Sequence, residues 1–472
     1  MDNKYKRLAQ NSFWSLIGNA GSKVLGFLLL PLYTRWLGTV GFGESDLITT
    51  YSSFLICVMT MCVSDAIFVF TKNEDLERQK VFFSTSLSFV LFLLLVWLLI
   101  WGGLDIGFSI YEIRNSFTNN LWLIYGVVVS TFLQQYSQQF VLGIEKIKLY
   151  SLIGIIYTLL TFFLSYWLIP IMGVKGYILA VIYSNILTAA YSFVFSRSYS
   201  YVSLSKIDFC RLKEVLKYSI PLIPNGIMWW LVSAINRPVM EYYLDYSAIG
   251  IYAVASRFPS VIMMVFTVFS VAWNISVFEE YGKDDYEDFY EKTFRMLFLV
   301  VVTISSIFIA FSELIVRVFT APEFYEAWKY MVLLIIGSVF SCLSSFTGVN
   351  FGVVKQSKYY LYSSIWGAVA AIALNLLLIP LLGLWGAAIS MLLSFAVMMV
   401  SRYIYSLKYV KSPLHQYYMG YTIVLGAVAC ACLYVDNNVA RFLLTTLILF
   451  FLLFRERSML NYIVIFIYRR VN

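Results

Sequence analysis

The sequence predicts an all-α polytopic membrane protein, and three observations lead to this prediction. Hydrophobic residues occupy 61% of the 472 positions and charged residues only 13%, which is more apolar side chain than the core of a soluble domain this long can hide. Apolar runs of about 20 residues, the length that crosses a bilayer, recur along the whole chain. Lys and Arg gather in alternate connectors between these runs. A soluble enzyme is therefore excluded.

The apolar runs predict about 14 transmembrane helices. Their approximate positions are 12–34, 44–70, 81–103, 119–142, 150–170, 175–196, 218–243, 249–278, 292–312, 328–351, 360–381, 385–407, 417–435 and 439–454. We expect an N-terminal six-helix lobe over 1–196, a cytoplasmic linker over 197–217, and a C-terminal six-helix lobe over 218–407. Two terminal helices and a basic cytoplasmic tail occupy 408–472. Whether the short run at 439–454 fully crosses is left open.

The distribution of basic residues predicts the orientation of these helices. If the N-terminus is inside, the internal segments carry 25 of the 34 Lys and Arg residues, Arg402 among them, and the external segments carry 6. This bias places both termini in the cytoplasm and supports an even number of crossings. The net charge of +8 then reflects topology rather than nucleic-acid binding. The external connectors are too short for a domain with hydrolytic or polymerising chemistry.

The two halves of the sequence resemble each other. At an offset of 207, Pro31 and Gly43 match Pro238 and Gly250. At an offset of 210, residues 168–176 match residues 378–386, and each segment contains Ile-Pro-x-x-Gly-x-x-Gly. Because each half has an even number of helices, the halves share one orientation. This is the parallel-repeat arrangement of rocking transporters.

Four basic residues within or beside the spans are candidate ligands for an anion. They are Lys23, Arg35, Arg237 and Arg257. A charge inside a membrane is costly unless it faces a wet cavity or a partner, and Arg grips phosphate in bidentate fashion. We therefore expect a cationic lumen that binds a phosphate-containing substrate. The alternatives are that Arg237 pairs with Glu241 one turn away, or that either arginine extends to the membrane surface.

Further polar residues of the spans are candidates for lining the same cavity. Asn19 shares a helix face with Lys23, and Asn225 and Ser233 share a face with Arg237, because they recur every four residues. Gln134 and Gln138 form an amide pair that suits a hydroxyl-rich sugar, although hydrogen bonding between helices explains them equally well.

Energy coupling requires a carboxylate that is charged in one state and neutral in the other. Asp65 and Glu241 are candidates for coupling to H⁺ or Na⁺. The sequence contains no recognisable catalytic or nucleotide-binding motif. Its one histidine, His415, has no neighbouring ligand residue, so we expect no metal, no cofactor and no enzymatic activity.

The opening of the chain resembles a known family. The residues that carry the resemblance are NSFWSLIGN at 11–19, PLYTRWLG at 31–38 and GFG at 41–43, together with the two Ile-Pro-x-x-Gly-x-x-Gly junctions. They resemble the Wzx-type O-antigen and polysaccharide repeat-unit flippases of the multidrug/oligosaccharidyl-lipid/polysaccharide (MOP) exporter superfamily.

The resemblance implies a MATE/MOP-like fold with two six-helix lobes around a cavity. It also implies that polyprenyl-diphosphate-linked oligosaccharide repeat units of O-antigen or capsule are moved from the cytoplasmic to the outer leaflet of a bacterial inner membrane by alternating access. Membrane lipids, a polysaccharide polymerase and a chain-length regulator are implied partners. The cationic lumen of the family corresponds to Lys23, Arg35, Arg237 and Arg257 by helix position only.

The sequence argues against two other functions. A cation-driven multidrug exporter of the same superfamily favours an acidic cavity, which the basic residues argue against. A membrane polysaccharide polymerase is an enzyme with a substantial outer loop, and the short external connectors argue against that.

Overall fold

The computed structural model describes residues 26–411, 414–435 and 438–457, and the regular elements in these residues are helices. Eight helices are long and apolar enough to cross a membrane, or up to ten if each of two bent pairs forms one span. The predicted all-α polytopic membrane protein is thereby confirmed. The count of 14 spans and the cytoplasmic location of both termini stay predictions.

The described residues form two compact units. The first comprises those up to Trp230 together with Asp245–Gly250, and the second comprises Leu231–Leu244 together with those from Ile251 onward. The lobe boundaries predicted at 196 and 218 stay predictions.

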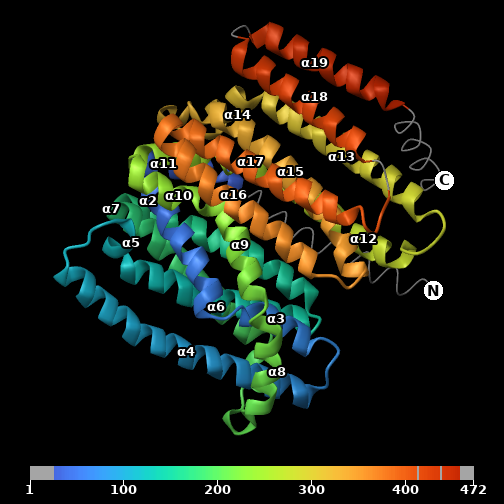
Figure 1. Ribbon diagram of the computed structural model, residues 1–472. Coiled ribbons are helices and arrows are strands. Elements are labelled where there is room, and N and C mark those ends of the chain that lie inside the picture. Colours follow the sequence, from blue (N-terminus) through green and yellow to red (C-terminus); the bar gives the residue numbers. More distant parts are fainter. Residues whose placement is uncertain (1–25, 412–413, 436–437, 458–472) are drawn as a thin grey trace. The chain divides into compact units, whose positions relative to one another are not determined.

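The first unit is built around α6 and α7, which pack lengthwise (Figure 1). Its helices are α2 (Leu30–Met59), α3 (Val63–Thr71), α4 (Leu76–Ile110), α5 (Ser116–Asn119), α6 (Leu121–Gly143), α7 (Ile147–Phe195), α8 (Phe209–Ser219) and most of α9 (Leu222–Ala234). Buried aromatic side chains form much of the core, and Trp101 and Tyr136 both have hydrogen-bonded polar atoms. The Trp101 indole N–H donates to the Leu121 carbonyl at 2.8 Å, and the Tyr136 hydroxyl donates to the Phe83 carbonyl at 2.8 Å.

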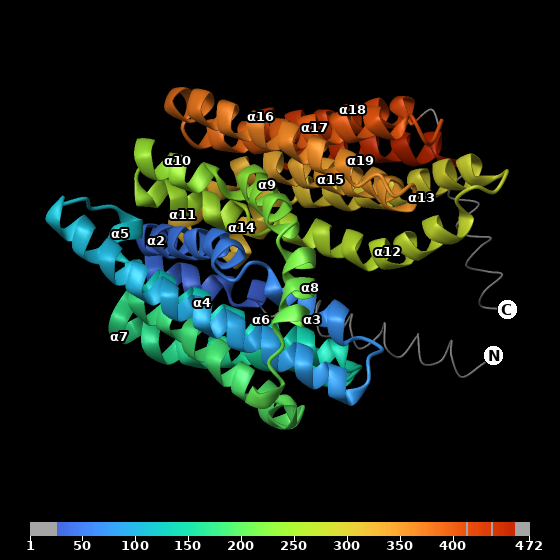
Figure 2. The same cartoon turned by 60° about the horizontal axis from the view of Figure 1, so that its bottom comes forward.

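The second unit is built around α15, most of whose side chains are buried. Its helices are α10 (Asn236–Tyr243), the end of α11 (Tyr246–Ala255), α12 (Pro259–Glu280), α13 (Tyr286–Ala310), α14 (Ser312–Phe319), α15 (Ala327–Val353), α16 (Lys358–Leu382), α17 (Leu384–Ser406), α18 (His415–Tyr434) and α19 (Asn438–Arg455). The α17 helix packs beside both α15 and α16 (Figures 1 and 2). Two ion pairs hold α19 in place, Arg295–Glu456 at 2.7 Å and Arg441–Glu313 at 3.0 Å.

The two junctions that the sequence matched have the same backbone geometry. Gly173 has φ 57° and ψ −130°, and Gly383 has φ 57° and ψ −129°. This left-handed φ favours glycine. A Cβ atom on Gly176 would lie 2.2 Å from the Leu168 carbonyl oxygen, and one on Gly386 would lie 2.1 Å from the Leu378 carbonyl oxygen. Both junctions thus require glycine for the same reason, which supports the predicted repeat.

A second pair of matched glycines makes a reciprocal contact within the first unit. A Cβ on Gly43 would lie 2.0 Å from the Tyr246 carbonyl oxygen, and a Cβ on Gly250 would lie 2.0 Å from the Thr39 carbonyl oxygen. Thr39 and Tyr246 are separated by the same 207 residues as the two glycines. The Ser247 hydroxyl also donates to the Thr39 hydroxyl at 2.8 Å. Both helices therefore approach at equivalent positions of the repeat, closely enough to exclude a methyl group.

Candidate functional site

Two helix breaks lie close together in the second unit, and a proline follows each. The first separates α9 from α10 at Ile235, where the chain bends by 46°. Pro238 explains this break because it has no N–H and its ring collides with the carbonyl of residue 234 in a helix. The second break occupies residues 256–258 between α11 and α12, and Pro259 is the first residue of α12. The span predicted over 249–278 corresponds to the candidate membrane span Tyr246–Glu280, and the turn at residues 256–258 within it was not predicted from the sequence.

Arg237 connects the two breaks. Its guanidinium donates to the Ser233 carbonyl at 2.8 Å, the Asn236 side-chain oxygen at 2.8 Å and the Ser256 hydroxyl at 2.9 Å. Ser233 lies in the last turn before the first break and Ser256 lies in the second. The Arg237 side chain is buried, and its guanidinium carbon lies 5.0 Å from the centre of the Tyr252 ring. Arg237 therefore ties the two interrupted helices together.

Arg257 lies within the second break and is exposed. The Arg257 backbone N–H donates to the Val254 carbonyl at 3.0 Å, so the backbone forms a tight turn at this position. The exposed Arg257 side chain therefore lies at the second break. Its neighbour in the sequence, Ser256, accepts a hydrogen bond from the buried Arg237.

Helix interruptions within membrane-spanning segments have a known physical requirement. Non-helical backbone at membrane depth is tolerated only where it is buried in protein or lines a water-filled cavity. In secondary transporters, such broken helices carry the substrate and ion sites. The paired breaks with Arg237 and Arg257 are therefore the candidate substrate site.

The remaining predicted site residues are distributed as follows. Ser233 and Glu241 flank Arg237 on α9 and α10 of the second unit. Arg35 is exposed on α2, Asp65 is exposed on α3, and Asn225 lies on α9, all in the first unit, as are Gln134 and Gln138 on α6. Lys23 and Asn19 lie outside the described residues.

The amides of the first unit have contrasting surroundings. The Gln134 side chain donates to the Gln138 side-chain oxygen at 2.9 Å, and the Gln138 side chain donates to the Tyr150 carbonyl of α7 at 3.5 Å. These bonds fit the expected role in helix packing. The Asn225 side-chain oxygen is buried and accepts no hydrogen bond from the part of the chain that the structure describes, so it is available to a ligand or to water.

Sequence reasoning missed a fully buried arginine in the second unit. Arg402 was counted as a topological charge, but α17 buries it completely. It donates to the Ser363 hydroxyl at 2.9 Å and the Ser364 hydroxyl at 3.1 Å, and its guanidinium carbon lies 4.0 Å from the centre of the Tyr360 ring. No carboxylate pairs with it among the described residues. The missed signal was the four-residue spacing of the buried residues Ser390, Ser394, Met398 and Arg402 along α17.

The described residues contain no group of three or more His, Cys, Asp and Glu side chains that could hold a metal ion. The chemistry of the candidate site is that of hydrogen-bond donors and positive charge.

Comparison with solved structures finds proteins of similar fold. The chain resembles the lipid II flippase MurJ in an inward closed conformation, with a TM-score of 0.66 and 15% identity over 94% of this chain and 99% of that one. It also resembles an inward-facing multidrug-resistance MATE transporter of the MOP superfamily, with a TM-score of 0.62 and 15% identity over 80% and 93% of the two chains. The Vibrio cholerae MATE transporter VcmN, solved as a mutant, gives 0.53 and 11% over 85% and 96%. A search of curated sequences finds no match.

The chain is a multi-pass membrane protein whose fold is similar to that of MurJ and the MATE transporters. A sequence model of the polysaccharide biosynthesis protein family matches residues 8–274, more than half of the chain. A MatE model matches residues 221–377. The chain belongs to the polysaccharide biosynthesis protein family.

Proposed function

We propose that this protein is a flippase for polyprenyl-diphosphate-linked oligosaccharide repeat units of O-antigen or capsule, in the inner membrane of a bacterium. It moves them from the cytoplasmic to the outer leaflet by alternating access. The observation that carries the proposal is the pair of helix breaks, which the buried Arg237 connects and the second of which contains the exposed Arg257. The family match and the similarity of fold to a flippase for a lipid-linked substrate support it.

The chemistry of this substrate fits the site. A diphosphate is costly to remove from water unless charge and hydrogen bonds replace its hydration, and guanidinium groups provide both. Arg257, being exposed, makes the direct contact with the diphosphate. Arg237 holds the two breaks in register and adds positive charge behind the site. Lys23, Arg35, Asn19, Asn225 and Ser233 stay predicted residues of the cationic lumen.

Coupling to H⁺ or Na⁺ is part of the proposal, and Asp65 and Glu241 are its candidate carboxylates. The Asp65 side chain is exposed on α3 and makes no hydrogen bond to another described residue, which leaves it accessible to a cation. A polysaccharide polymerase and a chain-length regulator act on the product after it reaches the outer leaflet.

Genetic complementation tests this function. Deletion of the gene is expected to abolish surface polysaccharide and to cause lipid-linked repeat units to accumulate on the cytoplasmic side.

Arg257→Gln is expected to leave the protein in the membrane at a normal level but to restore less than about a tenth of export, since a charged hydrogen bond contributes roughly 1.5–3 kcal/mol. Arg317→Gln is the matched control because Arg317 is an exposed arginine of the second unit, outside the site, paired with Glu313 at 2.8 Å. Normal export by an Arg237→Gln/Arg257→Gln double variant contradicts the proposal.

The MatE match over residues 221–377 favours one second candidate, a multidrug exporter. A cationic drug does not suit a site formed by two arginines. Efflux of a cationic dye that depends on the protein, with surface polysaccharide unaffected by the deletion, would establish this alternative in place of the flippase.

A further inference from the structure

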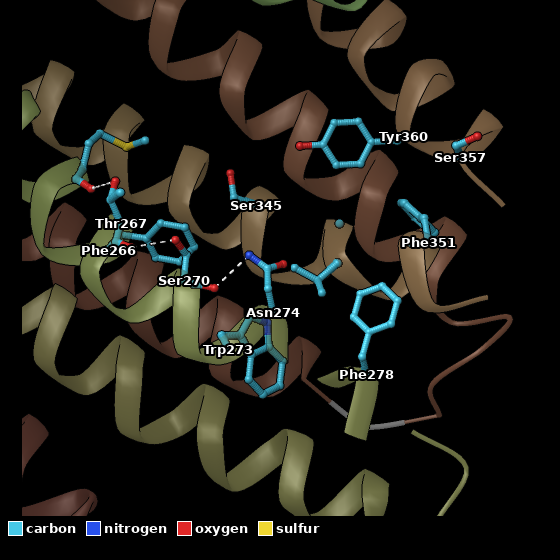
Figure 3. A pocket seen from close by; sticks show the side chains of 14 residues that line it. Phe266, Thr267, Ser270, Trp273, Asn274, Phe278, Ser345, Phe351, Ser357 and Tyr360 are labelled. Carbon is cyan, nitrogen blue, oxygen red and sulfur yellow. Dashed lines mark hydrogen bonds between the residues drawn. The ribbon is translucent and has the colours of Figure 1, made fainter. Parts of the chain in front are cut away.

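The second unit contains a pocket of about 450 Å³ between α12, α15 and the start of α16 (Figure 3). No charged residue lines it. Its polar lining consists of short hydroxyl and amide side chains, and its apolar lining is largely aromatic. The polar side chains are those of Thr267, Ser270, Asn274, Ser345, Ser357 and Tyr360, and the aromatic ones include Phe266, Trp273, Phe278 and Phe351.

Several polar atoms of this pocket have no hydrogen-bond partner among the residues that the structure describes. The Asn274 amide nitrogen donates to the Ser270 carbonyl at 2.8 Å, whereas its amide oxygen accepts nothing from the described residues. The hydroxyls of Ser345 and Ser357 likewise make no hydrogen bond within the described part of the chain. In Figure 3 the Asn274 amide, the Ser345 hydroxyl and the Tyr360 hydroxyl point toward the same space. These groups offer both donors and acceptors to a ligand.

Two glycines one turn apart on α15 line the pocket, and Gly348 leaves room for the Tyr360 ring. A Cβ atom on Gly348 would lie 2.8 Å from the Tyr360 ring, and one on Gly352 would lie 3.6 Å from the Phe278 ring. The Arg402 guanidinium carbon lies 4.0 Å from the centre of the Tyr360 ring, and the guanidinium donates to the Ser344 carbonyl at 3.3 Å. A buried cation against an aromatic face is a favourable contact, and it fixes the orientation of the phenol.

We infer that this pocket binds the saccharide part of the substrate, a neutral hydroxylated ring system. The inference rests on the proposed function and deepens it. Sugar rings present hydroxyl groups at their edges and C–H groups on their faces, and the pocket offers hydrogen-bonding atoms together with aromatic surface. Its volume lies in the usual range for small-ligand sites. Lys355 and Lys358 flank Ser357 in a connector predicted to be cytoplasmic, which is the side from which the substrate enters.

Binding of two lipids to the purified full-length protein in nanodiscs tests the inference. The probes are polyprenyl diphosphate and polyprenyl-diphosphate N-acetylglucosamine, and the measured quantity is the ratio of their dissociation constants. The wild-type protein is expected to prefer the glycosylated lipid by about tenfold or more, the equivalent of one or two net hydrogen bonds. Asn274→Leu is expected to reduce this preference to about threefold or less, with the affinity for the bare lipid unchanged.

A matched pair of threonines controls for helix effects. The Thr267 hydroxyl donates to the Met263 carbonyl at 2.7 Å, and the Thr446 hydroxyl donates to the Phe442 carbonyl at 2.8 Å. Both side chains are exposed on helices of the second unit, but only Thr267 lines the pocket. Thr267→Val is therefore expected to weaken the preference for the glycosylated lipid, and Thr446→Val is not.

The outcomes separate the two proposals. Equal binding of both lipids by the wild-type protein, or an unchanged preference in Asn274→Leu and Thr267→Val, overturns the saccharide pocket while the flippase proposal stands. Failure of the wild-type protein to bind either lipid overturns the proposed function and the pocket with it.

Discussion

The matched helices α2 and α11 of the two repeats share their packing glycines and then diverge. Gly43 of α2 and Gly250 of α11 occupy matched positions, and each excludes a side chain for the same reason. Seven residues further on, Thr50 stands where the second repeat has Arg257, and two residues later Ser52 stands where it has Pro259. The α2 helix continues to Met59, whereas α11 ends at Ala255. The repeat has thus kept its packing glycines, whereas the turn at residues 256–258 and its arginine have no counterpart at residues 49–51 of the first copy, where the 54° bend between α2 and α3 comes later, at residues 60–62.

In the part of the chain that the structure describes, the second unit also buries more charged side chains than the first. Among the described residues, the one charged side chain buried in the first unit is Asp46. The second unit buries Arg237, Arg402, Arg441 and Glu456. Arg441 and Glu456 take part in the ion pairs that hold α19, while Arg237 and Arg402 lie beside the helix breaks and the pocket. The anion site that we propose is therefore built largely from residues of the second unit.

The largest effect is expected from the glycines that the repeats share. Gly43→Ala and Gly250→Ala each place a methyl group 2.0 Å from a backbone carbonyl, so the helices must separate, and we expect a loss of about 3 kcal/mol or more in folding free energy. The measurement is thermal stability and monodispersity of the purified protein.

Gly102→Ala is the control for this comparison, because nothing lies within 4 Å of a Cβ atom at Gly102 of α4. We expect that variant to match the wild type or to be slightly more stable, since alanine favours a helix. If the Gly43 and Gly250 variants were as stable as the Gly102 variant, the reciprocal contact would be wrong.

Pro259→Ser introduces the residue type that the first repeat has at the matched position, Ser52. We expect this variant to have a smaller effect on stability but a large effect on function. The new N–H at position 259 can donate to the Ala255 carbonyl, so the helix can continue through residues 256–258. We expect slower amide hydrogen exchange at these residues and loss of polysaccharide export. Pro322→Ser, at the start of η3 (Pro322–Phe324), is the control. Full export by Pro259→Ser would show that the break is dispensable.

The smallest effect is expected from Arg402, the buried charge that the first unit lacks. Replacing a buried charge by an apolar side chain of similar size is often neutral or stabilising by about 1–4 kcal/mol. We therefore expect Arg402→Met to unfold at the same or a higher temperature while losing preference for the glycosylated lipid. Arg402→Lys retains the cation and should recover part of that preference. A clear drop in the stability of Arg402→Met, with the lipid preference intact, would assign Arg402 a purely structural role.

Sequence patterns predicted more of the fold than of the site. Both Ile-Pro-x-x-Gly-x-x-Gly junctions could be found because left-handed backbone and close carbonyl contacts demand glycine at fixed spacing. Arg237 and Arg257 could be found because a charge within an apolar run is conspicuous. The breaks were missed although Pro238 and Pro259 follow these arginines within two residues.

Arg402 and the pocket could not be predicted in the same way. Arg402 lies at the end of an apolar run, where a basic residue ordinarily marks the cytoplasmic side. The pocket brings together residues that are nearly 100 positions apart in the sequence, such as Thr267 and Tyr360, and its short polar side chains look ordinary within their own helices. Only tertiary packing reveals that they face one space.

Reconstituted lipid translocation tests the central claim most directly. Purified protein would be placed in vesicles that contain a fluorescent polyprenyl-diphosphate oligosaccharide in the inner leaflet, with an H⁺ or Na⁺ gradient imposed, and exposure of the lipid to an impermeant quencher would be followed. We predict rapid exposure with the wild-type protein and with Arg317→Gln, and a rate close to that of protein-free vesicles with Arg257→Gln. Equal rates for the wild-type protein and Arg257→Gln, or no exposure above protein-free vesicles with either, would contradict the account.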